Sequence, residues 1–91
     1  MSRGIVKFTL SARQCRGARA MLGWSQDELA TAADVSRATI ATFERGERLP
    51  TGSNLASIRE ALEKAGIVFI PENGGGAGVR MKDRESDEHA D

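Results

Sequence analysis

The sequence predicts a mostly α-helical domain followed by a C-terminal pair of β-strands. Ser11 and Ser25 are each followed three residues later by Gln or Glu, a pattern that marks the start of a helix. Apolar residues then recur at helical spacing, and Gly23 and Gly66 stand where helices are expected to stop. An apolar run over residues 67–70 precedes a glycine-rich stretch, which favours a hairpin.

The first helix is predicted over residues 12–22. Ser11 and Gln14 form its capping box, and Gly23 ends it. One face of this helix is apolar except for Arg19, a charged side chain that needs an explanation on such a face.

The next two helices are short and joined by a tight turn. The second begins after Ser25 and ends near Ala33, where Asp34 tolerates a left-handed conformation. The third begins after Ser36 and ends at Gly46. Two short helices in this order have the layout of a helix-turn-helix, whose second helix enters the major groove of DNA. The face of the third helix that is expected to point outward carries Arg37, Ala38, Ala41, Thr42 and Arg45.

A fourth helix is predicted over residues 53–65, and strands over residues 67–70 and 79–82. The glycine-rich run between the strands lacks the Lys-Ser/Thr ending of a phosphate-binding loop and is interpreted as a hairpin connection. An isolated two-stranded hairpin is only marginally stable, so a second copy of the chain is the simplest source of a further sheet edge.

The formal net charge of the 91-residue chain is zero, but the charges are unevenly distributed. Residues 1–50 carry eight basic and five acidic side chains, and residues 83–91 form an acidic tail that we expect to be disordered. Neutrality therefore hides a mildly basic first half, which is compatible with a nucleic-acid partner.

Few residues suit other chemistry. Cys15 is the only cysteine and is interpreted as a buried apolar side chain, and His89 stands alone in the tail, so we expect no metal site and no cofactor. The chain offers no paired catalytic groups and is not expected to be an enzyme. It contains neither a signal peptide nor a membrane-spanning run, which predicts a cytoplasmic protein without a membrane partner.

Residues 11–62 resemble the phage repressor/Cro-like helix-turn-helix regulators, the XRE family. That family's fold is a compact bundle of four or five helices, so the resemblance implies a repressor-like DNA-binding bundle. The resemblance rests on Leu22-Gly-Trp-Ser-Gln-Asp-Glu-Leu-Ala, Val35-Ser-Arg-Ala-Thr-Ile, Phe43-Glu-Arg-Gly and Pro50.

The resemblance also implies roles for single residues. Gln26 matches a position that contacts a phosphate and braces the recognition helix, and Arg19 and Glu44 match an ion pair that joins the first and third helices. Arg37 departs from the glutamines of some relatives and is suited to guanine. The residues expected to contact DNA are Gln26, Ser36, Arg37, Ala38, Thr39, Thr42, Arg45 and Arg48.

The sequence thus predicts an N-terminal arm (1–10), a DNA-binding domain (11–66), a C-terminal dimerisation element (67–82) and the tail (83–91). Dimer contacts are expected from Val68, Phe69, Ile70, Val79 and Met81. The expected function is that of a homodimeric transcriptional regulator, most simply a repressor, on a palindromic operator. Two alternatives stay open: an antitoxin with a toxin partner, and a protein-interaction module that does not bind DNA.

Overall fold

The computed structural model describes residues 10–71 and 74–82, and in this part of the chain four helices precede a two-stranded antiparallel sheet. The predicted mostly α-helical fold with a C-terminal strand pair is confirmed. The expectations for residues 1–9 and for the tail fall outside the described residues. The elements are α1 (Ala12–Leu22), α2 (Gln26–Ala33), α3 (Arg37–Glu44), α4 (Gly52–Lys64), β1 (Ile67–Ile70) and β2 (Gly78–Met81).

The helix boundaries follow local hydrogen bonds between residues three apart. Ser11 and Gln14 bond reciprocally at 3.0 Å, side chain to backbone in both directions, and Ser25 forms the same capping box with Glu28. Gly23 ends α1 with a φ of 69°. Because these bonds need only neighbouring residues, the predicted bounds of α1 and of the start of α2 agree with the structure.

Two predicted elements are displaced by one residue. Helix α4 begins at Gly52 rather than residue 53, because the Thr51 hydroxyl accepts the backbone N–H of Asn54 and acts as the cap. Strand β2 begins at Gly78 rather than residue 79, because Gly78 pairs with Ile70 at the end of the ladder.

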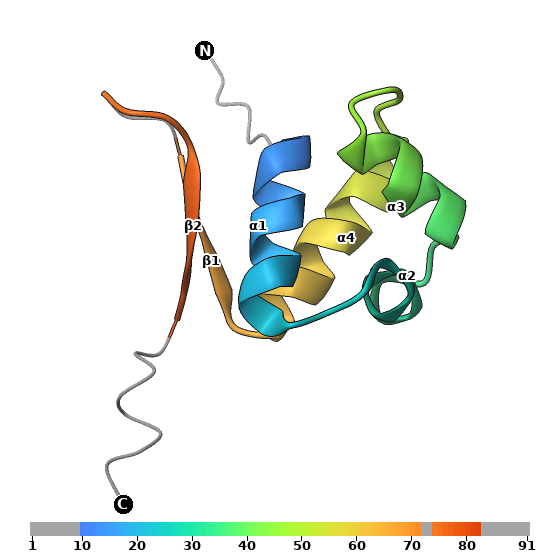
Figure 1. The fold of residues 1–91 in the computed structure, drawn as a ribbon, viewed down its shortest axis with the longest axis horizontal. Coiled ribbons are helices and arrows are strands. Elements are labelled where there is room, and N and C mark those ends of the chain that lie inside the picture. The colour runs from blue at the N-terminus through green and yellow to red at the C-terminus, as the bar shows by residue number, and fades with distance from the viewer. Residues whose placement is uncertain (1–9, 72–73, 83–91) are drawn as a thin grey trace, which may run out of the picture.

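The core lies where the four helices converge (Figure 1). Helix α2 packs against α3 and α4, and α1 packs against α3 and the sheet. The largest fully buried side chains come from all four helices: Cys15, Leu29, Ile40, Ile58 and Leu62. Leu10 is also buried in this core, although the predicted boundary placed it in the N-terminal arm. The folded domain therefore includes Leu10.

The hairpin packs with one face against α1 and α4 (Figure 1). Side chains alternate along β1, so Ile67 and Phe69 point to the core, while Val68 is half-buried and Ile70 is exposed. The register pairs Phe69 with Val79 and Ile67 with Met81. Of the five expected dimer contacts, Phe69, Val79 and Met81 pack against the chain's own core.

Contacts with α1 and α4 stabilise the hairpin. The guanidinium carbon of Arg59 lies 4.8 Å from the centre of the Phe69 ring, which ties α4 to β1. The Gln14 side-chain amide donates to the carbonyl of Gly78 at 3.1 Å, which ties α1 to β2. Helices α1 and α4 of the same chain thus stabilise the hairpin, a role that the sequence analysis expected from a second copy of the chain.

Candidate nucleic-acid interface

The turn between α2 and α3 fixes the position of the second helix relative to the first. Asp34 adopts a left-handed conformation with a φ of 59°, a region that non-glycine residues seldom occupy. The N–H of Val35 then bonds to the carbonyl of Ala30 at 3.0 Å. Ser36 is the N-cap of α3, and its hydroxyl accepts the N–H of Thr39 at 3.0 Å.

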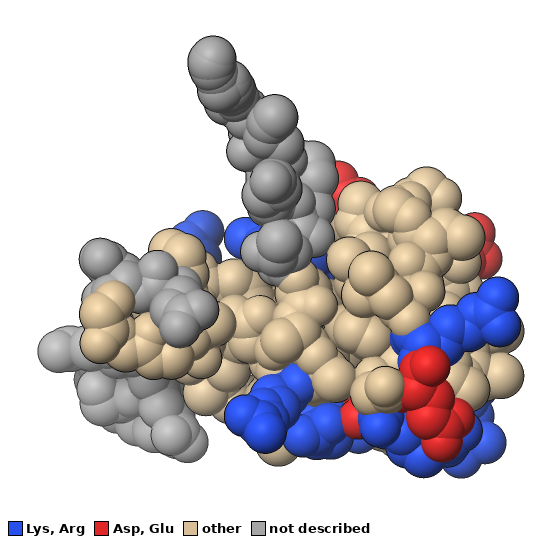
Figure 2. Space-filling model, turned by 90° about the horizontal axis from the view of Figure 1, so that it is seen from above, with Lys and Arg blue, Asp and Glu red and all other residues tan. Residues whose placement is uncertain are grey.

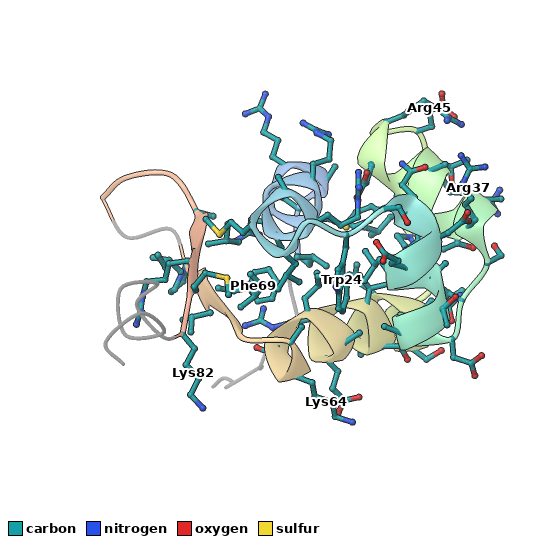
Figure 3. The ribbon with its side chains drawn as sticks, turned by 60° about the horizontal axis from the view of Figure 1, so that its bottom comes forward. Trp24, Arg37, Arg45, Lys64, Phe69 and Lys82 are labelled. Carbon is teal, nitrogen blue, oxygen red and sulfur yellow. The ribbon has the colours of Figure 1, made fainter. Side chains whose placement is uncertain are left out.

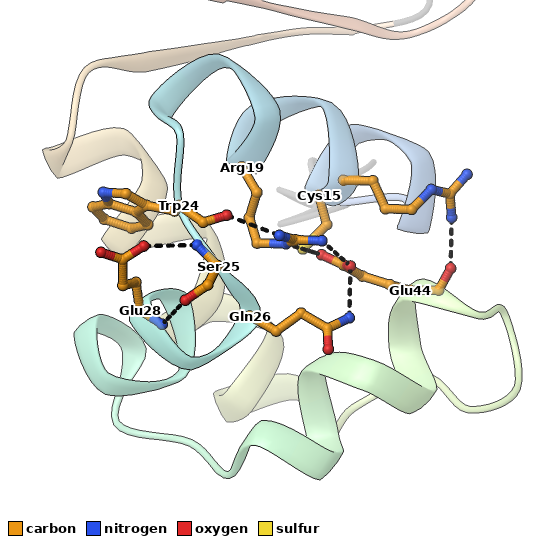
Figure 4. A network of polar contacts seen from close by, with 8 residues as sticks. Cys15, Arg19, Trp24, Ser25, Gln26, Glu28 and Glu44 are labelled. Atoms are coloured by element: carbon orange, nitrogen blue, oxygen red, sulfur yellow. Dashed lines mark hydrogen bonds and ion pairs between the residues drawn. The ribbon is translucent and has the colours of Figure 1, made fainter.

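The inner side of α3 is held by a bidentate ion pair with α1 (Figure 4). Arg19 Nη2 lies 2.7 Å from Glu44 Oε1, and Arg19 Nε lies 2.8 Å from Glu44 Oε2. Arg19 Nη1 also donates to the carbonyl of Trp24 at 2.8 Å. The pair explains why an arginine stands on the apolar face of α1, since its charge is neutralised by the partner on α3.

Two further side chains donate to Glu44, whose side chain is only 3% exposed. Gln26 Nε2 lies 3.1 Å from Oε1, and the Cys15 sulfur lies 3.1 Å from Oε2. Burial alone would raise the pKa of Glu44, but the hydrogen bonds from Arg19, Gln26 and Cys15 outweigh it, so the pKa lies below its usual value.

The pKa of Cys15 moves in the opposite direction. Burial of the thiol, together with the hydrogen bond to the Glu44 carboxylate, raises the pKa well above its usual value. Cys15 therefore stays a neutral thiol that donates to Glu44, in agreement with its burial in the core.

The outer side of α3 is open to solvent. Arg37 and Arg45 project from α3 and its C-terminal cap on the side of the molecule away from Lys64 and Lys82 (Figure 3). The Arg37 side chain is 64% exposed and lies 3.4 Å from Asp27 of α2. Arg45 pairs with Glu47 at 2.9 Å, and this hydrogen-bonded contact raises the pKa of Arg45 and lowers the pKa of Glu47.

A hollow runs along the same side, between α3 and the start of α4. It contains the expected contact residues Ala38, Thr39, Thr42 and Arg48. The sequence analysis did not expect DNA contacts from the other residues of its lining, which are Leu49, Pro50, Thr51 and Asn54. The structure thus brings four of the eight expected DNA contacts into one surface feature.

The remaining expected residues lie around this hollow or behind it. Arg37 and Arg45 project to solvent, whereas Ser36 is occupied as the cap of α3. Gln26 is half-buried, and its amide is bonded to Glu44, so in this structure it braces α3 from within. Lys and Arg side chains gather along one edge of the face seen in Figure 2, with an acidic group among them.

The sequence analysis did not predict the acidic partners of the two exposed arginines. Arg45 and Glu47 are two residues apart, a spacing that could have suggested their contact. Arg37 and Asp27 belong to different helices, and only the angle between α2 and α3 brings them together. No local pattern signals such a pair.

A sequence model of the helix-turn-helix family matches residues 16–66, more than half of the chain. The chain belongs to the XRE-type helix-turn-helix family. Members of this family are DNA-binding regulators, and the matched region includes the whole of α2, the turn and α3. No curated protein shows significant sequence similarity to this chain.

Two further findings concern the described residues alone. No helix among them is long and apolar enough to span a lipid bilayer. Within the same residues, no three side chains of His, Cys, Asp or Glu form a cluster that would suit a metal ion.

Proposed function

We propose that this helix-turn-helix protein is a sequence-specific transcriptional repressor that acts as a homodimer on a palindromic operator in the cytoplasm. The observation that carries the proposal is the contrast between the two sides of α3. Its inner side is held by the buried Arg19–Glu44 pair, its outer side presents the hollow that Thr42 lines, and Arg37 is exposed at its first turn. A rigid helix with an open polar face is what entry into the major groove requires.

Arg37 is the proposed source of base recognition by hydrogen bonding. Its guanidinium can donate two hydrogen bonds to the major-groove edge of a guanine. The contact with Asp27 is exposed at both ends and 3.4 Å long, so it is weak enough to give way to a base. Arg45 and Arg48 follow in the chain and are suited to phosphates, which fix the orientation of the protein on the duplex.

The dimer contacts are proposed to come from the face of the hairpin that points away from the helices. Val68 and Ile70 lie on that face, and Ile70 is 39% exposed. A two-stranded sheet also leaves unpaired backbone groups along its edges, which can accept a strand from a second copy. In such a dimer the two copies of α3 would enter successive major grooves, about 34 Å apart.

The test begins with selection of bound duplexes from a random DNA library, followed by mobility-shift titration with the best sequence. The proposal expects an inverted repeat, binding that weakens steeply as salt rises, and a dimer mass by light scattering. A reporter gene placed behind the selected sequence should be expressed less when the protein is present.

Each part of the proposal has an opposing result. Equal binding to all sequences would contradict specific recognition. A monomeric mass with a single half-site would contradict the dimer, and increased reporter expression would contradict repression.

Ile70→Lys should weaken the dimer without unfolding the chain, because Ile70 is exposed. Phe69 is not a suitable probe, since its ring belongs to the core.

A further inference from the structure

The hydroxyl groups of Thr39 and Thr42 on α3 already have hydrogen-bond partners within the helix or at its N-cap. The Thr42 hydroxyl donates to the carbonyl of Ala38 at 3.0 Å, and also lies 3.4 Å from the carbonyl of Thr39. The Thr39 hydroxyl is bonded to that of Ser36 at 2.9 Å. Residues that look polar in the sequence therefore offer few hydrogen-bond donors to a base.

The hydrogen bond of Thr42 determines which of its groups is left for a ligand. A threonine hydroxyl carries a single hydrogen, and here the carbonyl of Ala38 takes it. The other branch at Cβ is a methyl group. Thr42 lines the hollow beside α3. Its methyl is the apolar group that it can offer to a ligand there, and its oxygen can only accept a hydrogen bond.

Three other lining residues, Ala38, Leu49 and Pro50, are apolar, whereas the remaining ones, Thr39, Arg48, Thr51 and Asn54, are polar or charged. Ala38 contributes only a methyl group and is exposed. Leu49 is 69% exposed, the largest value among the exposed large apolar residues, and it lines the same hollow together with Pro50. The hollow has a volume of about 450 Å³, which is enough to receive the edge of a base.

Duplex DNA presents one apolar group in its major groove, the 5-methyl of thymine. We propose that the hollow formed by Ala38, Thr42 and Leu49 reads thymine methyl groups, so that each operator half-site contains at least one thymine recognised without a hydrogen bond. This inference rests on the proposed function, because it specifies the base that the exposed side of α3 selects. Arg37 and the hollow then divide recognition between a guanine and a thymine.

The first test removes the methyl group from the DNA. Each thymine of the selected operator is replaced in turn by deoxyuridine, which keeps every hydrogen-bonding group and lacks only the 5-methyl. We expect at least one replacement per half-site to lower the affinity about fourfold, which corresponds to the burial of one methyl-sized group. Uridines placed outside the half-sites are the control and should have no effect.

The second test removes the methyl group from the protein. Thr42→Ser keeps the hydroxyl and loses the methyl, whereas Thr42→Val keeps a methyl at the same place and loses the hydroxyl. We expect Thr42→Ser to bind about fourfold more weakly and to become insensitive to the uridine replacement. Thr42→Val should bind within twofold of the parent protein, and circular dichroism of both variants checks that they are folded.

The outcomes separate this inference from the proposed function. Specific binding in which no uridine replacement lowers affinity would overturn the inference alone. So would a weakened Thr42→Val beside an unaffected Thr42→Ser, since that result would mean that the Thr42 oxygen accepts a hydrogen bond from a base. Absence of any sequence preference in the parent protein would overturn the proposed function, and the inference with it.

Discussion

Two Arg–carboxylate ion pairs involve α3, and they differ in burial and in function. On the inner side, Arg19 and Glu44 form a bidentate pair at 2.7 Å, with side chains 20% and 3% exposed. At the exposed start of α3, Arg37 and Asp27 of α2 stand 3.4 Å apart, with side chains 64% and 77% exposed. Burial, not residue type, separates a pair that holds the fold from a pair that solvent screens and a ligand can displace.

This difference has a consequence for function. A recognition helix must keep its position while its contact residues exchange water and intramolecular partners for DNA. Glu44 provides the first property, since three donors from α1 and α2 converge on its carboxylate. Arg37 provides the second, because its ion pair with Asp27 is long and exposed.

The largest effect is expected from breaking the inner pair. Arg19→Met leaves the Glu44 carboxylate buried without its cation, which should lower the free energy of unfolding by about 3–5 kcal/mol. Urea denaturation followed by circular dichroism measures the change. Arg13→Met, on the exposed side of the same helix, is the matched control and should stay within about 0.5 kcal/mol of the parent. An Arg19→Met protein as stable as the parent would contradict a structural role for the pair.

The next effect concerns DNA and should leave stability untouched. Arg37→Ala is expected to weaken binding to the selected operator by roughly 1–3 kcal/mol and to remove the preference for guanine at one position. Mobility-shift titrations against the four base variants at that position measure both quantities. A variant that loses affinity equally for all four bases would show that Arg37 contacts only the backbone.

A smaller effect is expected from acid, and its sign follows from the lowered pKa of Glu44. Above the usual carboxyl pKa of about 4.3, Glu44 is ionised in both states and its contribution is complete. As the pH falls below that value, the unfolded chain takes up the proton first, so the free energy of unfolding decreases until the folded pKa is passed. Glu44→Gln should lack this part of the decrease when urea denaturation is compared from pH 7 to pH 3. Parallel curves for the two proteins would contradict the assignment.

The smallest effect is expected at the outer pair. Asp27→Asn removes an exposed partner, so stability should change by less than about 1 kcal/mol. DNA affinity should rise, because Arg37 is released and a negative charge leaves the side that faces phosphate. Glu60→Gln, on the exposed surface of α4, is the matched control. Glu28→Gln is unsuitable, because the Glu28 side chain belongs to the capping box of α2. Unchanged or weaker DNA binding by Asp27→Asn would contradict a restraining role for Asp27.

The amino-acid sequence by itself determined most of the element boundaries, because those signals are local. Capping boxes such as Ser25–Glu28 and the stop at Gly23 connect residues only a few positions apart, so they can be recognised without the fold. The resemblance to a known family added the inner pair, which no local pattern contains. The family match over residues 16–66 confirms the resemblance from which the Arg19–Glu44 pair was expected.

The tertiary structure alone decided which side chains are available. It placed Phe69 in the core, because α1 and α4 cover that face of the hairpin. It brought Asp27 to Arg37 across two helices and opened the hollow that Leu49 lines. These contacts depend on the angles at which the elements pack, and those angles follow from the whole core rather than from the residues that make the contact.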